Sequence, residues 1–253
     1  MSVNQIIHTI QGEGQTCGMP CVLVRLDGCN CHCTWCDTKR TWNHCARQLT
    51  DDDVKNIIEA KDKLSTITTL MLTGGEPTLY IHDKNLQTVI NLGWKNVIIE
   101  TNGTRLHELK SVLDADKIDP YLNISISPKL NVSYYDDPHE FQQMLYNIQK
   151  IAPNLDIFKA EASIKLVYDP LEEDELLRFI DQTNIRDNID IYIMTKTPRR
   201  ETDELAWLAK IHQLDLKTIE FCMKHGFKFS PRLHLDLFCT YENYETEMSS
   251  IIK

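Results

Sequence analysis

Strand-like and helix-like segments alternate along most of this 253-residue chain. Runs of β-branched and apolar residues are typical of buried strands, and the longer stretches between them carry apolar residues at helical spacing. About six such repeats predict a parallel sheet whose strands are joined by right-handed helical crossovers. A barrel is the natural closure of such a sheet, so we expect an α/β barrel.

The predicted segments have the following bounds. We expect strands at residues 21–26, 66–73, 96–100, 121–125, 163–168 and 190–194. We expect helices at residues 85–92, 140–151, 171–183 and 201–214, and a further helix that begins after an N-cap at Thr50. Polar clusters come directly after three of the strands, at residues 74–77, 101–104 and 127–129. Because α/β barrels carry their sites at the carboxyl ends of their strands, these clusters predict an active site.

Composition limits the class of protein. The net charge is −10 and the pI is near 5.4, which argues against a nucleic acid partner held by counterion release. No run of eighteen apolar residues is present, and the first ten residues lack a signal-peptide pattern, so we expect a cytoplasmic protein with no membrane partner. We find no linker or repeat, which favours a single domain over residues 1–253 with a less regular tail from about residue 236.

Cysteines cluster near the N-terminus. Seven of the nine lie within residues 17–45, and four of those lie within residues 29–36. Two disulfides in so short a loop would be strained, so the cluster indicates metal ligation in a reducing compartment. The spacing of Cys29, Cys33 and Cys36 fits three irons of a [4Fe–4S] cluster and leaves the fourth iron open. The alternative is a zinc site, completed by Cys31 or His32, or by Cys17, Cys21 or Cys45.

Two other features admit both a structural and a functional interpretation. Glycines flank Glu13 in residues 10–14, which is typical either of a surface turn or of a loop that approaches a ligand closely. Arg25 interrupts an otherwise apolar strand, so it needs an anionic partner, either a structural carboxylate or an acidic ligand.

The C-x3-C-x-aromatic-C loop, followed by Gly-Gly-Glu-Pro at residues 74–77, resembles the radical S-adenosylmethionine (radical SAM) superfamily. More narrowly, the chain resembles the 7-carboxy-7-deazaguanine synthase family over residues 5–130, and again at residues 231–234. The motifs that carry this resemblance are residues 10–14, 24–30, 35–38, 72–77, 100–104 and 127–129. The resemblance implies a full or partial (β/α)6 TIM-like barrel of the radical SAM type.

The resemblance also implies the roles of individual residues. Cys29, Cys33 and Cys36 would hold the cluster, and Thr38 would be a ligand of a substrate-bound Mg²⁺. S-adenosylmethionine would contact Trp35, Asp37, Gly75, Glu76, Asn102, Ser127, Lys129 and Met194. The substrate would contact Gln11, Gly12, Glu13, Arg25, Thr73 and His234. No side chain would act as a catalytic acid or base, because the cofactor performs the difficult bond cleavage.

The implied reaction is a radical ring contraction of 6-carboxy-5,6,7,8-tetrahydropterin. It gives 7-carboxy-7-deazaguanine and ammonia, as in the biosynthesis of 7-deazapurines such as queuosine. The implied cofactors are a [4Fe–4S] cluster, S-adenosylmethionine and Mg²⁺. The implied partners are the pterin, an external one-electron reductant such as flavodoxin, and a second copy of the chain in a homodimer.

Simpler interpretations exist for several of these residues. Asn102 and Gly103 could only turn the chain, Thr38 could cap a helix, and Met194 could be a core residue. The chain departs from the family pattern at Cys31, at residues 192–199 and after residue 236. Two other functions therefore remain as alternatives: a glycyl-radical-enzyme activase of the same superfamily, and a non-catalytic zinc or iron–sulfur protein.

Overall fold

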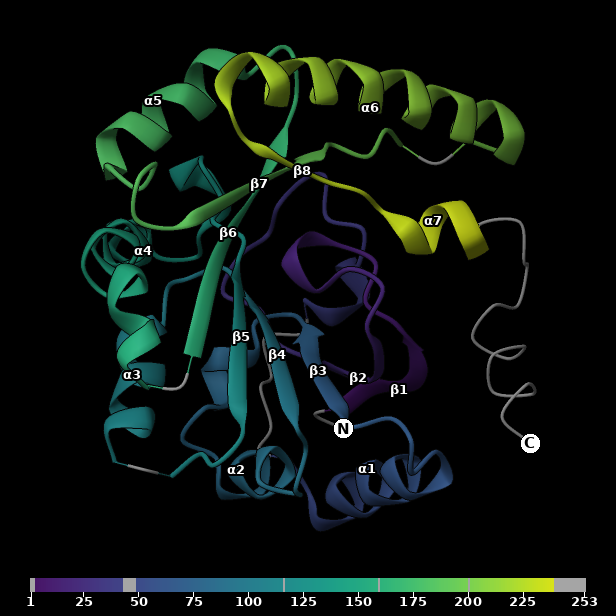
Figure 1. The fold of residues 1–253 in the computed structure, drawn as a ribbon, viewed down its shortest axis with the longest axis vertical. Coiled ribbons are helices and arrows are strands. Elements are labelled where there is room, and N and C mark those ends of the chain that lie inside the picture. The colour runs from purple at the N-terminus through teal and green to yellow at the C-terminus, as the bar shows by residue number, and fades with distance from the viewer. Residues whose placement is uncertain (1–2, 43–48, 116, 159, 200, 239–253) are drawn as a thin grey trace.

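The computed structural model describes residues 3–42, 49–115, 117–158, 160–199 and 201–238 (Figure 1). Its strands form one sheet in which the order in space follows the order in the chain. They are β1 (Val3–Ile10), β2 (Pro20–Leu26), β3 (Thr69–Gly74), β4 (Asn96–Thr101), β5 (Tyr121–Ile126), β6 (Ala160–Tyr168), β7 (Asp190–Thr195) and β8 (Lys228–Ser230). β1 pairs antiparallel with β2, and every later pair is parallel.

Helices surround the outside of this curved sheet (Figure 1). The α-helices are α1 (Asp51–Lys63), α2 (Lys84–Ile90), α3 (Leu106–Asp114), α4 (Pro138–Lys150), α5 (Glu173–Thr183), α6 (Glu204–His225) and α7 (Leu233–Phe238). Short 3₁₀ helices are η1 (Gly14–Thr16), η2 (Lys39–Thr41), η3 (Pro77–Tyr80), η4 (Val132–Tyr134) and η5 (Ala152–Phe158). The predicted α/β fold, a partial TIM-like barrel, is confirmed.

The structure corrects several element bounds. The helix predicted at residues 201–214 is α6 and continues to His225, because its stop signal is Gly226 in the left-handed conformation at φ +75°. β1, β8, α3 and α7 carried no pattern that we recognised. The predicted cap of α1 is confirmed, since Thr50 and Asp53 form a reciprocal capping box.

Among the described residues, no helix combines the length and the apolarity that a bilayer crossing requires.

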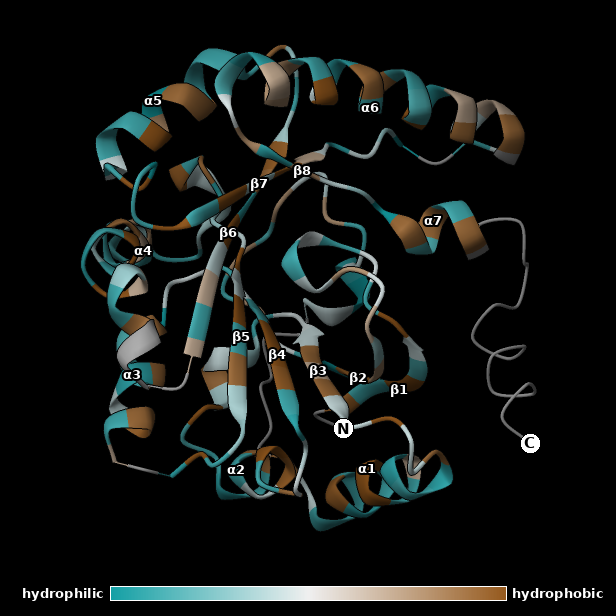
Figure 2. Ribbon diagram, viewed as in Figure 1, coloured by the Kyte–Doolittle hydropathy of each residue, from teal (hydrophilic) through white to brown (hydrophobic). Residues whose placement is uncertain are grey.

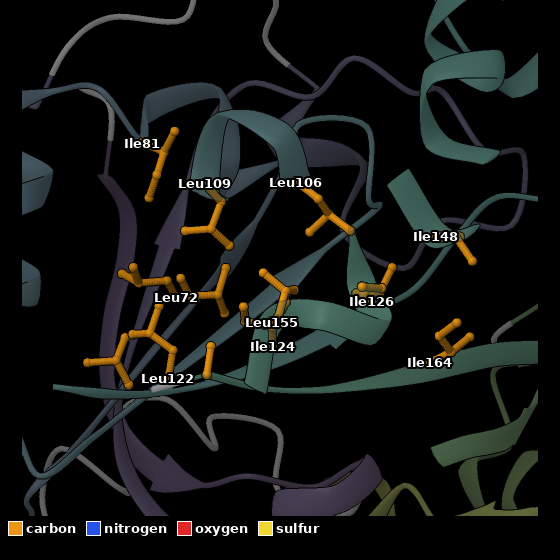
Figure 3. Packing of buried hydrophobic residues seen from close by; sticks show 14 of the residues in the cluster. Leu72, Ile81, Leu106, Leu109, Leu122, Ile124, Ile126, Ile148, Leu155 and Ile164 are labelled. Atoms are coloured by element: carbon orange, nitrogen blue, oxygen red, sulfur yellow. The ribbon is translucent and has the colours of Figure 1, made fainter. Parts of the chain in front are cut away.

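The main core lies between the sheet and the helices. Alternate residues of the strands point outward, where Val22, Val24, Leu70 and Leu72 are fully buried. Figure 3 shows their counterparts from neighbouring strands and helices in one continuous cluster. Figure 2 shows the same arrangement, with hydrophobic residues on the strands and along one side of each surrounding helix.

The inner face of the sheet changes character along the strands. Its lower part is a small apolar cluster of Cys21, Leu23, Met71 and Ile98. Two residues further along each strand, the inward positions become polar, with Arg25 on β2, Thr73 on β3 and Glu100 on β4. The sheet therefore has a closed apolar floor and a polar upper layer at the carboxyl ends of its strands.

The connection between β1 and β2 bridges the open side of the barrel. The Gly14 backbone N–H donates to Ser230 Oγ at 2.8 Å, and the Leu233 N–H donates to the Gly12 carbonyl at 3.0 Å. Gly12 packs directly against His234, so a side chain at residue 12 would have no room. These contacts join the connection between β1 and β2 to the last strand and to the segment that follows it.

We expect Gly12→Ala to weaken this closure. The added Cβ would lie 2.3 Å from His234 Nδ1 and 3.0 Å from the His234 backbone nitrogen, so one segment must move. The expected loss of stability is about 1–3 kcal/mol, measured by thermal unfolding. Combining Gly12→Ala with His234→Ala removes the clashing imidazole and should restore most of the loss. A single variant as stable as the wild type would contradict this view of the closure.

Candidate active site

One cavity of about 420 Å³ opens at the carboxyl ends of the strands. All of the site residues predicted from the sequence line it. They are Gln11, Gly12, Glu13, Arg25, Cys29, Cys33, Trp35, Cys36, Asp37, Thr38, Thr73, Gly75, Glu76, Asn102, Ser127, Lys129, Met194 and His234. Because these residues come from segments spread over most of the chain, it is the fold that brings them together.

The cysteine loop rests on the backbone of Gly74 and Gly75. The Gly75 N–H donates to the Leu26 carbonyl at 2.8 Å, and the Glu76 N–H donates to the Gly28 carbonyl at 2.7 Å. A Cβ on Gly75 would lie 1.8 Å from the Gly28 carbonyl oxygen, and Gly74 has φ +122°. Two successive residues here must be glycine, because the loop and the end of β3 are in direct backbone contact.

Cys29, Cys33 and Cys36 all line the cavity, and so does Cys31. A hydrogen bond from Cys31 lowers the pKa of Cys29, whereas burial raises the pKa of Cys33 to about 11 and also raises that of Cys36. Among the described residues, no three His, Cys, Asp or Glu side chains converge closely enough to hold one metal ion. A cluster needs no such convergence, because each thiolate binds a different iron, so the donor set fits a cluster better than zinc.

Cys31 has a structural place in this loop. It is buried, pairs with Tyr135 in an isolated β-bridge, and accepts a hydrogen bond from Asn102 Nδ2 at 3.4 Å. Among the other cysteines named as zinc ligands, Cys21 belongs to the apolar floor of the sheet, and Cys45 lies outside the described residues.

Trp35, Ser127 and Lys129 meet on one wall of the cavity. The Lys129 ammonium lies 5.2 Å from the centre of the Trp35 ring and donates to Ser127 Oγ at 3.2 Å. Trp35 also makes an edge contact with Tyr134, with ring centres 6.3 Å apart. Trp35, which directly precedes Cys36, and the residues that follow β5 therefore form one cationic and aromatic surface.

Glu76 and Asn102 belong to a buried network beneath the cysteine loop. Glu76 accepts hydrogen bonds from Thr101 Oγ1 at 2.7 Å and from the Asn102 N–H at 2.6 Å, while burial raises its pKa. The Asn102 side chain donates to Asn30 Oδ1 at 2.7 Å and accepts from Thr104 Oγ1 at 2.8 Å. Asn102 thus lines the cavity while its amide holds the loop in place.

Arg25, Asp37 and Thr38 form a hydrogen-bonded group that also lines the cavity. Thr38 Oγ1 donates to Asp37 Oδ1 at 2.9 Å and accepts from Arg25 Nη1 at 3.4 Å. Arg25 Nε donates to Gln5 Oε1 at 3.2 Å. Thr38 precedes the 3₁₀ helix η2, but its side chain makes no capping hydrogen bond. Its hydroxyl is therefore part of the cavity wall and not a helix cap.

Four charged residues of the cavity had no role predicted from the sequence: Arg40, Glu100, Lys165 and Arg232. Lys165, on β6, donates to Glu13 Oε2 and to Glu100 Oε2, both at 2.6 Å. Arg232 Nη2 lies 3.2 Å from Asp37 Oδ2, and Arg232 Nε lies 3.5 Å from Glu13 Oε1. A signal for Lys165 was present, since a lysine within an apolar strand requires an anionic partner in the same way as Arg25.

The cation pair around Glu13 sets its ionisation. The Lys165 ammonium and the Arg232 guanidinium hold its pKa well below the usual range, despite the opposing effect of burial. His234 Nε2 lies 3.9 Å from Glu13 Oε1, and burial lowers the pKa of this imidazole. Glu13 is therefore a carboxylate and His234 is neutral at pH 7.

A second hollow, of about 910 Å³, adjoins the first cavity. The two share Trp35, Cys36, Asp37, Thr195 and Arg232 in their walls. Tyr168 and Trp207 supply aromatic surface at its far side. The cysteine loop thus borders two adjoining spaces, which is enough room for two ligands side by side.

We expect Gly75→Ala to displace the cysteine loop. The new Cβ would collide with a backbone oxygen, which cannot turn aside as a flexible side chain can. The expected costs are about 2–3 kcal/mol of stability and loss of bound iron after anaerobic reconstitution. Gly93→Ala is a control for backbone strain alone, because φ there is +76° but the added Cβ meets nothing within 4 Å. Equal iron content in Gly75→Ala and the control would disprove the role of this contact.

Comparison with known proteins agrees with the geometry. The family model described as the radical SAM superfamily matches residues 23–127. A 7-carboxy-7-deazaguanine synthase from Bacteroides thetaiotaomicron is 42% identical over 103 residues, which cover 41% of this chain and 52% of that protein. Thus the match spans about half the length of that relative. A synthase of the same name from Halobacterium salinarum is 27% identical, over 94% of this chain and 90% of its own.

Among solved structures, the crystal structure of QueE from Escherichia coli is similar in fold. The TM-score is 0.59 at 23% sequence identity, covering 92% of this chain and 93% of the other. A likeness at this identity concerns the fold alone, and it agrees with the partial barrel described above. The implied cofactors of the matched superfamily, S-adenosylmethionine and a [4Fe–4S] cluster, fit the three thiols at the cavity. Residues 23–127 therefore match the radical SAM superfamily model, and the partial barrel agrees with that match.

Proposed function

We propose that this protein is a 7-carboxy-7-deazaguanine synthase. It converts 6-carboxy-5,6,7,8-tetrahydropterin to 7-carboxy-7-deazaguanine, and the nitrogen that is lost leaves as ammonia. The observation that carries the proposal is that every residue expected from the synthase motifs lines one cavity beside the three thiols. Relatives that carry this name align with about two fifths or with nearly all of the chain.

Cys29, Cys33 and Cys36 would hold the [4Fe–4S] cluster at the cavity wall. Their loop is fixed by backbone hydrogen bonds from the Gly75 and Glu76 N–H groups to the Leu26 and Gly28 carbonyls, and not by the metal alone. When bound, the cluster and S-adenosylmethionine supply a 5′-deoxyadenosyl radical. The protein's own task is then to place the two ligands and to keep water and other hydrogen donors away. The apolar floor of the sheet closes the cavity from below.

The S-adenosylmethionine would lie along the wall that carries the cationic and aromatic pair. We assign to it Trp35, Asp37, Gly75, Glu76, Asn102, Ser127, Lys129 and Met194. Lys129 can meet its carboxylate, and Trp35 offers a flat surface beside it. Glu76 and Asn102 act chiefly through the backbone that they order, because their side chains bond to neighbouring protein groups.

The pterin would lie over the polar inner layer of the sheet. We assign to it Gln11, Gly12, Glu13, Arg25, Thr73 and His234. Arg25 can meet the pterin carboxylate, and carboxylate and amide oxygens can take its N–H groups. None of these residues would need to act as a strong acid or base, because the cofactor supplies the radical chemistry.

The proposed function also implies partners, an oligomeric state and a location in the cell. We infer a one-electron reductant such as flavodoxin as a partner, homodimerisation, and a cytoplasmic location. We treat residues 1–253 as a single radical SAM domain, and only residues up to 238 of its tail are described, including the short helix α7. An activase of glycyl-radical enzymes is the alternative within the superfamily, and the names of the relatives do not favour it.

The direct test is anaerobic turnover. Reconstituted protein is incubated with 6-carboxytetrahydropterin, S-adenosylmethionine, Mg²⁺ and a reductant, and we expect carboxydeazaguanine and ammonia by mass spectrometry and ammonia assay. Cys33→Ala should abolish product formation, whereas Cys17→Ala should not, since Cys17 does not line the cavity. If 5′-deoxyadenosine forms without carboxydeazaguanine, the substrate assignment is wrong. A colourless protein that binds zinc, with no iron or sulfide, would refute both radical SAM functions, the synthase and the activase.

The Mg²⁺ ligand gives a separate prediction. We propose that Thr38 Oγ1, which faces the cavity between Asp37 and Arg25, is an oxygen ligand of a substrate-bound Mg²⁺. Thr38→Val removes the hydroxyl at nearly constant volume and should reduce the Mg²⁺-stimulated rate about 10- to 100-fold. Thr38→Ser keeps the hydroxyl and should retain the stimulation. If Mg²⁺ stimulates the rates of both variants equally, Thr38 is not a ligand of the Mg²⁺.

A further inference from the structure

Lys165 occupies an unusual position for a lysine. Its side chain is only 3% exposed, yet it lies in the middle of β6 and points into the cavity. The ammonium donates to one oxygen of Glu13 and to one oxygen of Glu100, at 2.6 Å in both cases. Two carboxylates thus share one cation, and the group of three keeps one net negative charge inside the barrel.

Neighbouring charges do not cancel this excess. Arg232 is the other cation beside Glu13, at 3.5 Å, and it also pairs with Asp37 at 3.2 Å. His234 contributes no charge near pH 7, because burial lowers its pKa. The negative wall therefore favours a ligand that brings hydrogen-bond donors and disfavours a second anion.

Glu100 has acceptor capacity to spare. Within the described residues, Oε1 accepts from Gln11 Nε2 at 3.0 Å and Oε2 accepts from Lys165. Each carboxylate oxygen can accept about two hydrogen bonds, so roughly half of the capacity of Glu100 remains. Its side chain is 14% exposed and lines the cavity, which leaves the unused lone pairs accessible to a ligand.

A purely structural role does not explain where this charge group lies. Buried ion pairs are often no more stabilising than apolar residues of the same size, and the inner face just below is apolar in β2, β3 and β4. The charges begin where the cavity begins. Glu100 is also two strands from Arg25, or about 10 Å at ordinary strand spacing, so a planar ligand can reach both.

We propose that Glu100 is a substrate-binding residue that accepts the 2-amino N–H of the aminopyrimidine ring, and that Lys165 is the positioning residue that holds Glu100 and Glu13. This inference rests on the proposed function, since a pterin has donors at one end and its 6-carboxylate at the other. The carboxylate then lies toward Arg25. The two ends of the ligand meet opposite charges, which fixes the direction in which it enters.

The test compares two oxidised ligands that differ at one group. 6-Carboxypterin carries the 2-amino group, and 6-carboxylumazine carries an oxygen in its place. Binding to the reconstituted holoenzyme is followed by ligand fluorescence, with S-adenosylmethionine present. The wild type should prefer 6-carboxypterin about 10- to 100-fold, because the lumazine oxygen would face the Glu100 carboxylate. Glu100→Gln, whose amide can donate to that oxygen, should bring the preference close to one.

The outcomes separate a binding role from a structural one. If Glu100→Gln weakens both ligands by the same factor, Glu100 only shapes the site and the inference is wrong. The inference also fails if the wild type shows no preference between the two ligands. Arg186→Gln is a control for removal of a surface charge, since Arg186 packs on Phe227 away from the cavity, and its preference should match the wild type.

Lys165 is tested through the same ratio. Lys165→Met leaves Glu13 and Glu100 without their shared cation and should lower the ligand preference, whereas Lys165→Arg should keep most of it. An unchanged ratio in a folded Lys165→Met would exclude the positioning role. If Lys165→Met does not fold, Lys165→Arg is compared with Glu100→Gln. The inference expects Glu100→Gln to lose the preference for 6-carboxypterin and Lys165→Arg to keep it, and any other result contradicts the inference. Wild-type turnover of 6-carboxytetrahydropterin tests the proposed function separately from these ratios.

Discussion

The ammonium group of Lys165 connects parts of the barrel that are far apart in the chain. Through its two hydrogen bonds, β6 is tied to β4 and to the loop that follows β1. In the part of the chain that the structure describes, β1 and β8 are not paired, so side-chain and loop contacts close the barrel on that side. Removing one partner of a buried ion pair typically costs about 3–5 kcal/mol, because the remaining charges stay buried. The shape of the cavity therefore depends on an electrostatic contact, whereas the outer core depends on apolar packing.

The motifs of the site act largely on one another. The backbone of Gly74 and Gly75 packs directly against the cysteine loop, and the Asn102 side chain holds the same loop by a hydrogen bond to Asn30. A residue can thus be essential at a cofactor site without touching the cofactor. This explains why the short polar segments after β3 and β4 accompany the cysteines in the sequence. They form the support that fixes the three thiols before any ligand binds.

The sequence predicted the local features well and the distant pairings poorly. Strand and helix periodicity located most elements, and the Thr50 cap was readable because capping is a contact over three residues. The pairing of Lys165 with Glu13 joins residues 152 apart, so no local pattern reports it. α6 was predicted too short because its exposed face carries Leu216 and Met223, which blur the helical pattern after residue 214. Arg232 was part of a recognised motif, but its partners Glu13 and Asp37 are only evident in the folded chain.

The arrangement of the thiols also bears on the choice of metal. A zinc ion requires four donors at nearly equal, short distances from one point, which a loop with only local constraints seldom supplies without a second knuckle. Here other elements hold the loop before Cys29, through the Gly75 and Glu76 N–H groups, and at its middle, where the His32 N–H donates to the Tyr134 carbonyl of η4. The three cysteines line the cavity, and among the residues that the structure describes no three His, Cys, Asp or Glu side chains gather around one point. A wall of three donors that faces an open space suits a cluster with one iron available to a ligand, and the adjoining cavity is where such a ligand would lie.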